Sequence, residues 1–330
     1  MKLLAFILPL LFFVACKKQN PVVDTPIIIS EEPLIILSSD WEKDNILSLD
    51  FPKSAAVYQN KSALNGHSFK ATAFVFNLAD TNLVISTALN TNRLTPNNWL
   101  ANEKGNILAV INGGYFDLTN GQSYSLVVNE NKMLSANVKA LTRSFNGVNT
   151  SYYPTRCAFG LTDRKPSCEW IYNVTGTVNY AYPGPSPNAL NAAPEAKPSE
   201  TFPVNGSVWS PQTAIGGSPM LLKNGNVMIS DVEELIDVNN KTGRSRSAIG
   251  FTAKNRVVIL AIEKNATTEN LGASLAEMAQ LLKDIGCTNA INLDGGGSTC
   301  LLVNNGKTTN QPEGNTQRAV SSVIFVKKKN

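Results

Sequence analysis

The sequence has a single histidine, His67, and this scarcity argues against several kinds of catalytic site. A Ser-His-Asp hydrolase and a histidine-rich zinc site both need histidines that the chain does not supply. The pattern GxxxxGK[ST] is also missing, which argues against a nucleotide P-loop. Chemistry in this chain therefore rests on carboxylates, arginines, amides and backbone N–H groups.

Charge of one sign is not concentrated anywhere along the chain. The 29 basic and 25 acidic residues leave a formal net charge of +4. No stretch interleaves aromatic with basic residues, which argues against a nucleic-acid partner. A hydrophobic content of 43% fits a globular domain with a sizeable core.

The N-terminus reads as an export signal. The apolar run of residues 3–14 is too short to span a bilayer, and Ala15-Cys16 follows it. The pattern resembles a bacterial lipoprotein signal, in which Cys16 is lipidated; an ordinary cleaved signal is the alternative. We therefore expect a signal peptide over 1–16, a tether over 17–45, one folded domain over 46–330, and an exported protein attached to the cell envelope by its lipid.

The other four cysteines are even in number, as disulfides formed after export would require. Three pairings are open, and we favour the two short closures, Cys157–Cys168 and Cys287–Cys300. Buried free thiols are the alternative.

The hydrophobic pattern predicts many strands and few helices. The segments expected as buried strands are 73–79, 106–111, 248–253, 256–263, 289–293 and 319–326. Helical spacing predicts a helix over 269–285 that ends at Gly286, and a second, weaker one over 95–104. The expected fold is a single α+β domain with strand-rich mixed sheets. The polar loop 182–200 is long enough to suggest a functional or mobile segment.

A glycine-rich loop precedes an expected hairpin three times. The segments "GGSPMLLKNGNV" (216–227) and "GGSTCLLVNNGK" (296–307) share this order, and "NGGYFDLTNGQSYSLVVNENK" (112–132) is a looser copy. Successive glycines can aim N–H groups at an anion, although they also serve as plain turns. The loops after strands 106–111 and 289–293 would converge if those strands were neighbours in one sheet.

Carboxylates and arginines near these loops are the candidates for chemistry. Arg244, Arg246 and Arg318 each precede a buried strand and can donate two N–H groups to a phosphate, although surface ion pairs are the commoner role. Asp294 is our first choice for the catalytic carboxylate. Glu263 at a strand end is the second.

Five motifs occur in an order that resembles the phosphodiester glycosidase family. They are "NGGYF" (112–116), "GGSPMLL" (216–222), "RSAIGF" (246–251), "NLDGGGST" (292–299) and "QRAVSSVIFV" (317–326). The resemblance covers about residues 50–328 and implies cleavage of a sugar–phosphate bond in a glycosyl phosphodiester, releasing sugar and a phosphomonoester.

The resemblance and the residues together give a set of expected site residues. Asp294 is expected to activate water or stabilise the sugar cation, with Arg246 and Glu263 as further catalytic residues. Substrate and phosphate are expected to contact Asn112, Gly113, Gly114, Tyr115, Gly216, Gly217, Asn292, Gly295, Gly296, Gly297, Ser298, Thr299 and Arg318.

Three further expectations concern ligands and partners. No cofactor is firmly implied, and a divalent cation near Asp294 stays open. The expected partner is a phosphoglycan or another sugar phosphodiester, and we expect a monomer. The alternative function is an exported lipoprotein that binds phosphoglycan or exopolysaccharide without cleaving it.

Overall fold

The computed structural model describes residues 33–38, 40–60, 62–267 and 269–329. The expected signal peptide, Cys16 and most of the expected tether lie outside these residues. The last part of the expected tether packs on the domain, because Leu34, Ile35 and Trp41 are buried in its core. The folded part therefore starts before residue 46. None of the described helices is long and apolar enough to cross a membrane.

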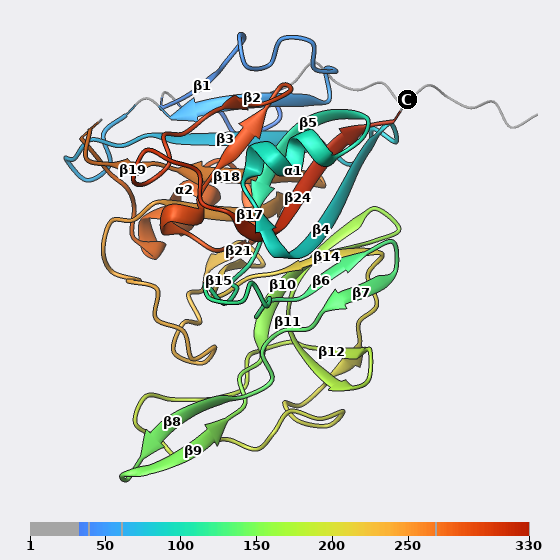
Figure 1. Cartoon of the computed structure of the whole chain (residues 1–330), viewed down its shortest axis with the longest axis vertical. Helices are drawn as coiled ribbons and strands as arrows, with labels where there is room; N and C mark the ends of the chain where they lie inside the picture. Colours follow the sequence, from blue (N-terminus) through green and yellow to red (C-terminus); the bar gives the residue numbers. More distant parts are fainter. Residues whose placement is uncertain (1–32, 39, 61, 268, 330) are drawn as a thin grey trace, which may run out of the picture.

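An eight-stranded sheet forms the upper part of the molecule (Figure 1). Its strands in spatial order are β1 (Trp41–Lys43), β2 (Ala55–Asn60), β3 (Ala71–Asn77), β18 (Arg256–Ile262), β17 (Arg246–Thr252), β21 (Cys287–Asn292), β15 (Met220–Lys223) and β16 (Asn226–Val227). The central strands are apolar on both faces. In β18, Val257 and Ile259 enter one core cluster, and Val258 and Leu260 enter another, as the alternation of side chains along a strand requires.

Two further sheets face this one. A five-stranded sheet contains β23 (Lys307–Thr308), β22 (Leu301–Val303), β5 (Asn106–Asn112), β24 (Val320–Lys328) and β4 (Leu83–Leu94). A seven-stranded sheet contains β13 (Ser207–Val208), β12 (Val178–Tyr182), β11 (Lys165–Thr175), β10 (Arg156–Thr162), β14 (Thr213–Gly216), β6 (Val127–Asn129) and β7 (Lys132–Ser135).

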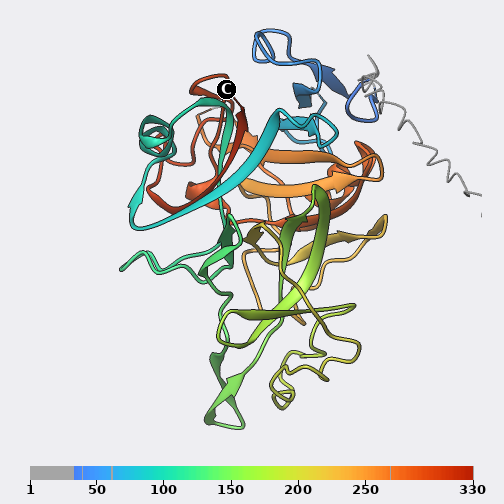
Figure 2. The same ribbon diagram turned by 90° about the vertical axis from the view of Figure 1, so that its right-hand side faces the viewer.

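The smallest sheets are two-stranded. They are β19 (Lys264–Asn265) with β20 (Asn270–Leu271), and β8 (Leu141–Phe145) with β9 (Val148–Tyr152). The β8–β9 hairpin projects from the lower end of the molecule in both views (Figures 1 and 2).

The main hydrophobic core lies where the three large sheets meet, with Phe74, Ile111 and Trp170 among its members. Helix α2 (Leu275–Asp284) covers the other face of the eight-stranded sheet through Met278 and Leu282. Helix α1 (Pro96–Asn102) packs Trp99 on the other face of the five-stranded sheet.

The expected α+β, strand-rich class is confirmed. Neighbouring described strands pair antiparallel, so the sheets are not mixed in direction. The longer expected helix is real but starts at Leu275, where Ser274 and Glu277 form a capping box, and Gly286 follows it with a φ of +97°.

Candidate active site

Two of the glycine loops meet where the five-stranded and eight-stranded sheets approach each other. The Asp294 N–H donates to the carbonyl of Gly113 over 3.1 Å, and Asn112 Nδ2 donates to the Asp294 carbonyl over 2.6 Å. The sequence indicated that these loops would converge if their strands were neighbours in one sheet. The loops converge although β5 and β21 belong to different sheets.

The third glycine loop packs against both of the others. A Cβ on Gly114 would overlap the carbonyl oxygen of Gly216, and a Cβ on Gly217 would overlap that of Asn292. A Cβ on Gly113 would strike the side chain of Ser322. These glycines therefore allow three backbone segments to touch, and none of them lines the pocket described below.

We expect Gly217→Ala to lower the free energy of unfolding by about 1–3 kcal/mol, because the new methyl group collides with backbone that cannot move alone. Chemical denaturation measures the change. Gly184→Ala is the matched control, since no atom lies within 4 Å of the added Cβ. Equal stability of the two variants would contradict this role for Gly217.

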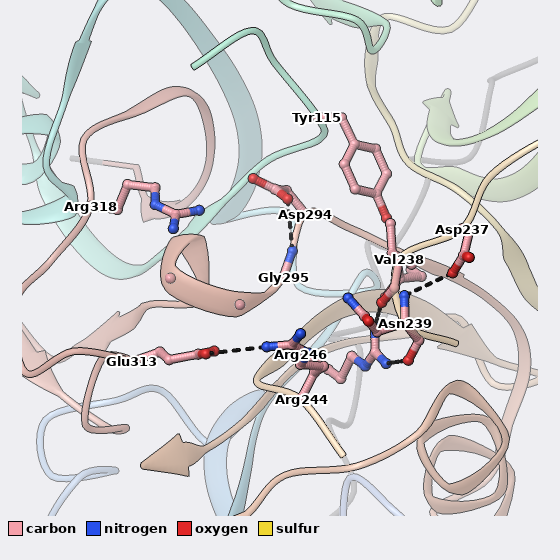
Figure 3. A pocket seen from close by; sticks show the side chains of 13 residues that line it. Tyr115, Asp237, Val238, Asn239, Arg244, Arg246, Asp294, Gly295, Glu313 and Arg318 are labelled. Atoms are coloured by element: carbon pink, nitrogen blue, oxygen red, sulfur yellow. Dashed lines mark hydrogen bonds and ion pairs between the residues drawn. The ribbon is translucent and has the colours of Figure 1, made fainter. Parts of the chain in front are cut away.

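A pocket of about 370 Å³ opens beside the point where the loops meet (Figure 3). It is lined by Tyr115, Asp237, Val238, Asn239, Arg244, Arg246, Asn292, Asp294, Gly295, Gly296, Gly297, Glu313 and Arg318. The sequence-predicted residues that it brings together are Tyr115, Arg244, Arg246, Asn292, Asp294, the three glycines and Arg318.

The surroundings of Asp294 shift its pKa toward neutral pH. Burial is the largest influence and raises its pKa from an ordinary 3.8 to about 6, against the opposing effects of Ser298, Arg318 and the Gly295 N–H. The Gly295 N–H donates to Asp294 Oδ1 over 3.0 Å. A carboxyl with a pKa near 6 can exchange a proton close to neutral pH.

The glycine turn holds Asp294 and makes room for an arginine. The Gly296 N–H donates to the Ser245 carbonyl over 2.8 Å, and the Gly295 N–H is used by Asp294. These two N–H groups serve the protein and not an anion, contrary to our expectation. A Cβ on Gly297 would come within 2.5 Å of Arg318 Nη2, so the guanidinium lies directly on this residue.

Two arginines bring positive charge to the pocket. Arg318 is exposed, and its Nη1 makes a long hydrogen bond of 3.4 Å to Ser298 Oγ. Arg244 Nη1 lies 3.6 Å from Glu313 Oε1, with side chains 37% and 31% exposed. Both guanidiniums have donors that can turn to an anionic ligand.

Arg246 supports the structure of the pocket, whereas we expected it to be a catalytic residue. Its guanidinium is buried and donates to four backbone carbonyls, those of Ala273, Val238, Asn239 and Thr242. Burial lowers its pKa to about 10. These contacts make Arg246 the support of the pocket wall formed by residues 238–242, and leave little of its donor capacity for phosphate.

The side chains of Asn112 and Asn292 also form hydrogen bonds to other groups of the protein. Asn112 Oδ1 accepts from Ser247 Oγ over 2.7 Å, and its amide bridges the two loops. Asn292 Nδ2 donates to the Tyr115 hydroxyl over 2.6 Å and to the Ser218 carbonyl over 2.7 Å. Asn292 therefore orients Tyr115, whose ring forms part of the pocket (Figure 3).

Glu263 does not reach the pocket. It is 1% exposed, and its carboxylate accepts from Asn270 Nδ2 over 2.9 Å, from the Gln311 N–H over 2.6 Å and from Lys70 Nζ over 3.3 Å. Its contacts fix the strand end instead. Ser298 and Thr299 are buried behind the glycine turn.

The described residues contain no group of three or more His, Cys, Asp or Glu side chains placed to hold a metal ion. Around Asp294, the pocket instead supplies arginines and glycines.

Neither favoured disulfide is present, because the four described cysteines are free and buried. The β10–β11 register sets Cys157 opposite Trp170 and Phe159 opposite Cys168, so the two cysteines are diagonal and not opposed. Cys287 opens β21 beneath α2, whereas Cys300 follows the glycine turn in the cluster under α1. The length of β21, about 16 Å, separates them.

We expect thiol titration of unfolded, non-reduced protein to find these four cysteines free. The folded protein should react slowly at pH 8, since burial raises the pKa of all four thiols, that of Cys300 to about 12. Titration before and after addition of a reductant checks this. A gain of thiols after reduction would show that a disulfide forms.

Comparison with known proteins identifies the family. Residues 105–327 match the family described as phosphodiester glycosidase. The chain belongs to this family. The resemblance carried by the five sequence motifs is thereby confirmed.

Two curated members of the phosphodiester glycosidase family align with the chain over 129 residues. They are the N-acetylglucosamine-1-phosphodiester α-N-acetylglucosaminidases of Mus musculus, at 30% identity, and Homo sapiens, at 32%. The aligned stretch is 34% of this chain and spans only 24% of either relative.

Solved structures share the fold of this chain. The zebrafish N-acetylglucosamine-1-phosphodiester α-N-acetylglucosaminidase catalytic domain matches with a TM-score of 0.54 at 16% identity, over 88% of this chain and 85% of that one. A hypothetical protein from Synechocystis matches with a TM-score of 0.56 at 17% identity, over 84% of this chain and 62% of that one.

Sequence reasoning missed Asp237, Val238, Asn239 and Glu313 as pocket residues. They lie in irregular segments, 228–245 and 309–319, without hydrophobic periodicity or a motif. The one usable signal was that each segment lies just before a strand and ends near a candidate arginine, Arg246 or Arg318.

Proposed function

We propose that the protein hydrolyses the bond between the anomeric carbon of a sugar and a phosphodiester oxygen, releasing free sugar and a phosphomonoester. One observation carries the proposal: Asp294, with a pKa raised to about 6, shares a pocket with the cationic Arg318 and Arg244. Membership of the phosphodiester glycosidase family supports the same reaction class.

In the proposed reaction, the Asp294 carboxylate accepts a proton from a water molecule that attacks the anomeric carbon. The carbon–oxygen bond breaks, and its electron pair stays on the phosphate oxygen. Arg318, lying on Gly297, stabilises the charge that develops there. Arg244 can leave Glu313 for the phosphate, because that contact is long and half-exposed.

The sugar is placed on the side of the pocket formed by Tyr115 and residues 237–239. Figure 3 shows Arg318 on one side of Asp294, and Tyr115, Asp237 and Asn239 on the other. The named activity of the relatives makes N-acetylglucosamine the first sugar to test.

The test is turnover of N-acetylglucosamine α-phosphate methyl ester by the purified protein at pH 7. We expect sugar and methyl phosphate in equal molar amounts. Saturable binding without release would favour the alternative, a lipoprotein that holds phosphoglycan or exopolysaccharide. Absence of both binding and release would refute the proposal for this sugar.

We also propose that the protein is exported and attached to the cell envelope through a lipid on Cys16, with no other membrane contact. We expect Cys16→Ser to move the protein from the membrane fraction to the soluble fraction, because the lipid chains supply the membrane affinity. Fractionation after expression in a bacterial host checks this. Membrane retention of the variant would contradict the lipid anchor.

A further inference from the structure

A second hollow continues the candidate active site, and its interpretation rests on the proposed function. This hollow, of about 460 Å³, shares Asp237 and Asn239 with the first pocket. Both shared residues are exposed, so they form a ridge between the two hollows, and a ligand in the first pocket would reach the second by crossing this ridge.

The walls of the second hollow include the β8–β9 hairpin and the long loop after β12, neither of which lines the first pocket. Arg143 belongs to the projecting β8–β9 hairpin, and Leu190 belongs to the long Pro/Ala loop noted in the sequence. The Leu190 side chain is 63% exposed, so its apolar surface is available to a ligand in this hollow.

Hydrogen bonds fix the parts of the second hollow relative to one another. Arg143 Nη2 donates to the Leu235 carbonyl over 2.7 Å, and Asn188 Nδ2 donates to the Glu233 carbonyl over 3.0 Å. The Tyr152 hydroxyl donates to the Ala192 carbonyl over 2.7 Å. Together with the contacts of Arg246 to residues 238–242, these bonds make the hollow a preformed feature.

The lining suits a neutral sugar better than a lipid or a second phosphate. Two basic side chains, Arg143 and Lys241, are balanced by two acidic ones, Asp231 and Asp237. Exposed polar groups lie next to the apolar surface of Leu190. Sugar rings present hydroxyl groups at their edges and C–H groups on their faces, and so match such a mixed surface.

The position of the second hollow indicates which end of the substrate would reach it. Arg318 lies on one side of Asp294, and Asp237 and Asn239 lie on the other (Figure 3). With the phosphate at Arg318, the sugar faces residues 237–239, and the hollow lies beyond the sugar. We infer that it holds a second sugar unit joined to the one that leaves the phosphate, so that the protein releases oligosaccharides from phosphodiester-linked glycan chains.

The inference predicts a preference for longer glycosyl groups. The probes are the N-acetylglucosamine α-phosphate methyl ester and three disaccharide counterparts, extended through β-1,3, β-1,4 or β-1,6 links. For at least one disaccharide, we expect kcat/KM to be about tenfold or more above that of the monosaccharide, since binding energy from the remote sugar contributes to the reaction. Equal or lower values for all three would overturn the inference.

Variants locate the effect in the second hollow. We expect Leu190→Asp to lower kcat/KM for the preferred disaccharide ester by about tenfold and to leave the monosaccharide ester unchanged. Val204→Asp is the matched control, because this residue lies in the same connection between β12 and β13, is 70% exposed and does not line the hollow. An equal loss on both esters, or the same loss in the control, would overturn the assignment.

A binding measurement separates this inference from the proposed function. The variant Asp294→Asn should bind at least one of the three disaccharide esters about tenfold more tightly than the monosaccharide ester in calorimetry. If no ester is hydrolysed by the wild type but this difference in affinity appears, the hydrolase proposal fails and the second sugar site stands. If the monosaccharide ester is hydrolysed and the affinities are equal, only the second sugar site fails.

Discussion

Replacing Asp294 by asparagine is expected to lower kcat/KM for a sugar phosphodiester by about 10²–10⁴-fold, the range in which a general base contributes to catalysis. The amide keeps the size of the carboxyl but cannot accept the proton of the attacking water. Steady-state release of free sugar by the purified variant and wild type measures the effect.

The pH dependence of kcat/KM is an independent test of the role of Asp294. Since the carboxylate is the active form, wild-type kcat/KM should fall as the pH drops below the Asp294 pKa of about 6. An acidic limb near pH 4, the range of an ordinary aspartate, would argue that Asp294 is not the titrating base.

The stability of the same variant should move in the opposite direction to its activity. The folded-state pKa of Asp294 is raised from 3.8 to about 6, so proton binding stabilises the fold below about pH 4, and this contribution is lost as the pH rises past 6. At pH 7 the wild type therefore holds a charge that its partly buried site disfavours. Asp294→Asn should be at least as stable as the wild type at pH 7, which separates lost chemistry from lost folding.

Asp117→Asn is the control for this experiment. Asp117 lies in the loop after the "NGGYF" motif but does not line the pocket, and hydrogen bonds from Thr119 lower its pKa to about 2. Its variant should keep activity close to that of the wild type. A comparable loss in both variants would show that any change in these loops disturbs the site.

The sequence predicts the central strands well because their burial on both faces leaves a continuous apolar run. β3 and β18 are of this kind, and both were expected within a few residues. β4 was not expected, since only its first six residues alternate buried and half-exposed positions, and the rest are half-exposed or exposed and mostly polar. A half-exposed strand at the edge of a sheet gives a weaker hydrophobic pattern in the sequence than a buried strand at its centre.

Part of the site was predicted from the sequence, and there is a physical reason why the rest was not. Asp294 and Arg318 lie beside recognisable strands and glycines, so sequence alone indicates them. The acceptors of Arg246 are backbone carbonyls, which leave no trace in residue type. Its role as a support for the pocket wall could therefore be seen only after the segment 238–242 was placed.

The largest expected effect after that of Asp294 comes from Arg318. We expect Arg318→Gln to lower kcat/KM for a methyl phosphodiester by about 10²–10³-fold, as the loss of a donor to a developing anion does. Glutamine retains a hydrogen-bond donor but has no charge, so the variant isolates the electrostatic part. Sugar release at constant ionic strength measures the effect, and Arg93→Gln, which removes the same charge outside the pocket, is the control.

The leaving group decides whether Arg318 acts on the departing phosphate. 4-Nitrophenyl phosphate leaves the anomeric carbon more readily than methyl phosphate and needs less stabilisation. Arg318→Gln should therefore impair hydrolysis of the 4-nitrophenyl phosphodiester less than that of the methyl phosphodiester. A loss of equal size on both esters would mean that Arg318 only binds the phosphate in the ground state, as uniform binding affects all such substrates alike. A loss no larger than that of Arg93→Gln would exclude Arg318 from the site. In that case Arg244, released from Glu313, is the arginine of the pocket with side-chain donors left for the phosphate, because those of Arg246 are largely used by the carbonyls of the wall.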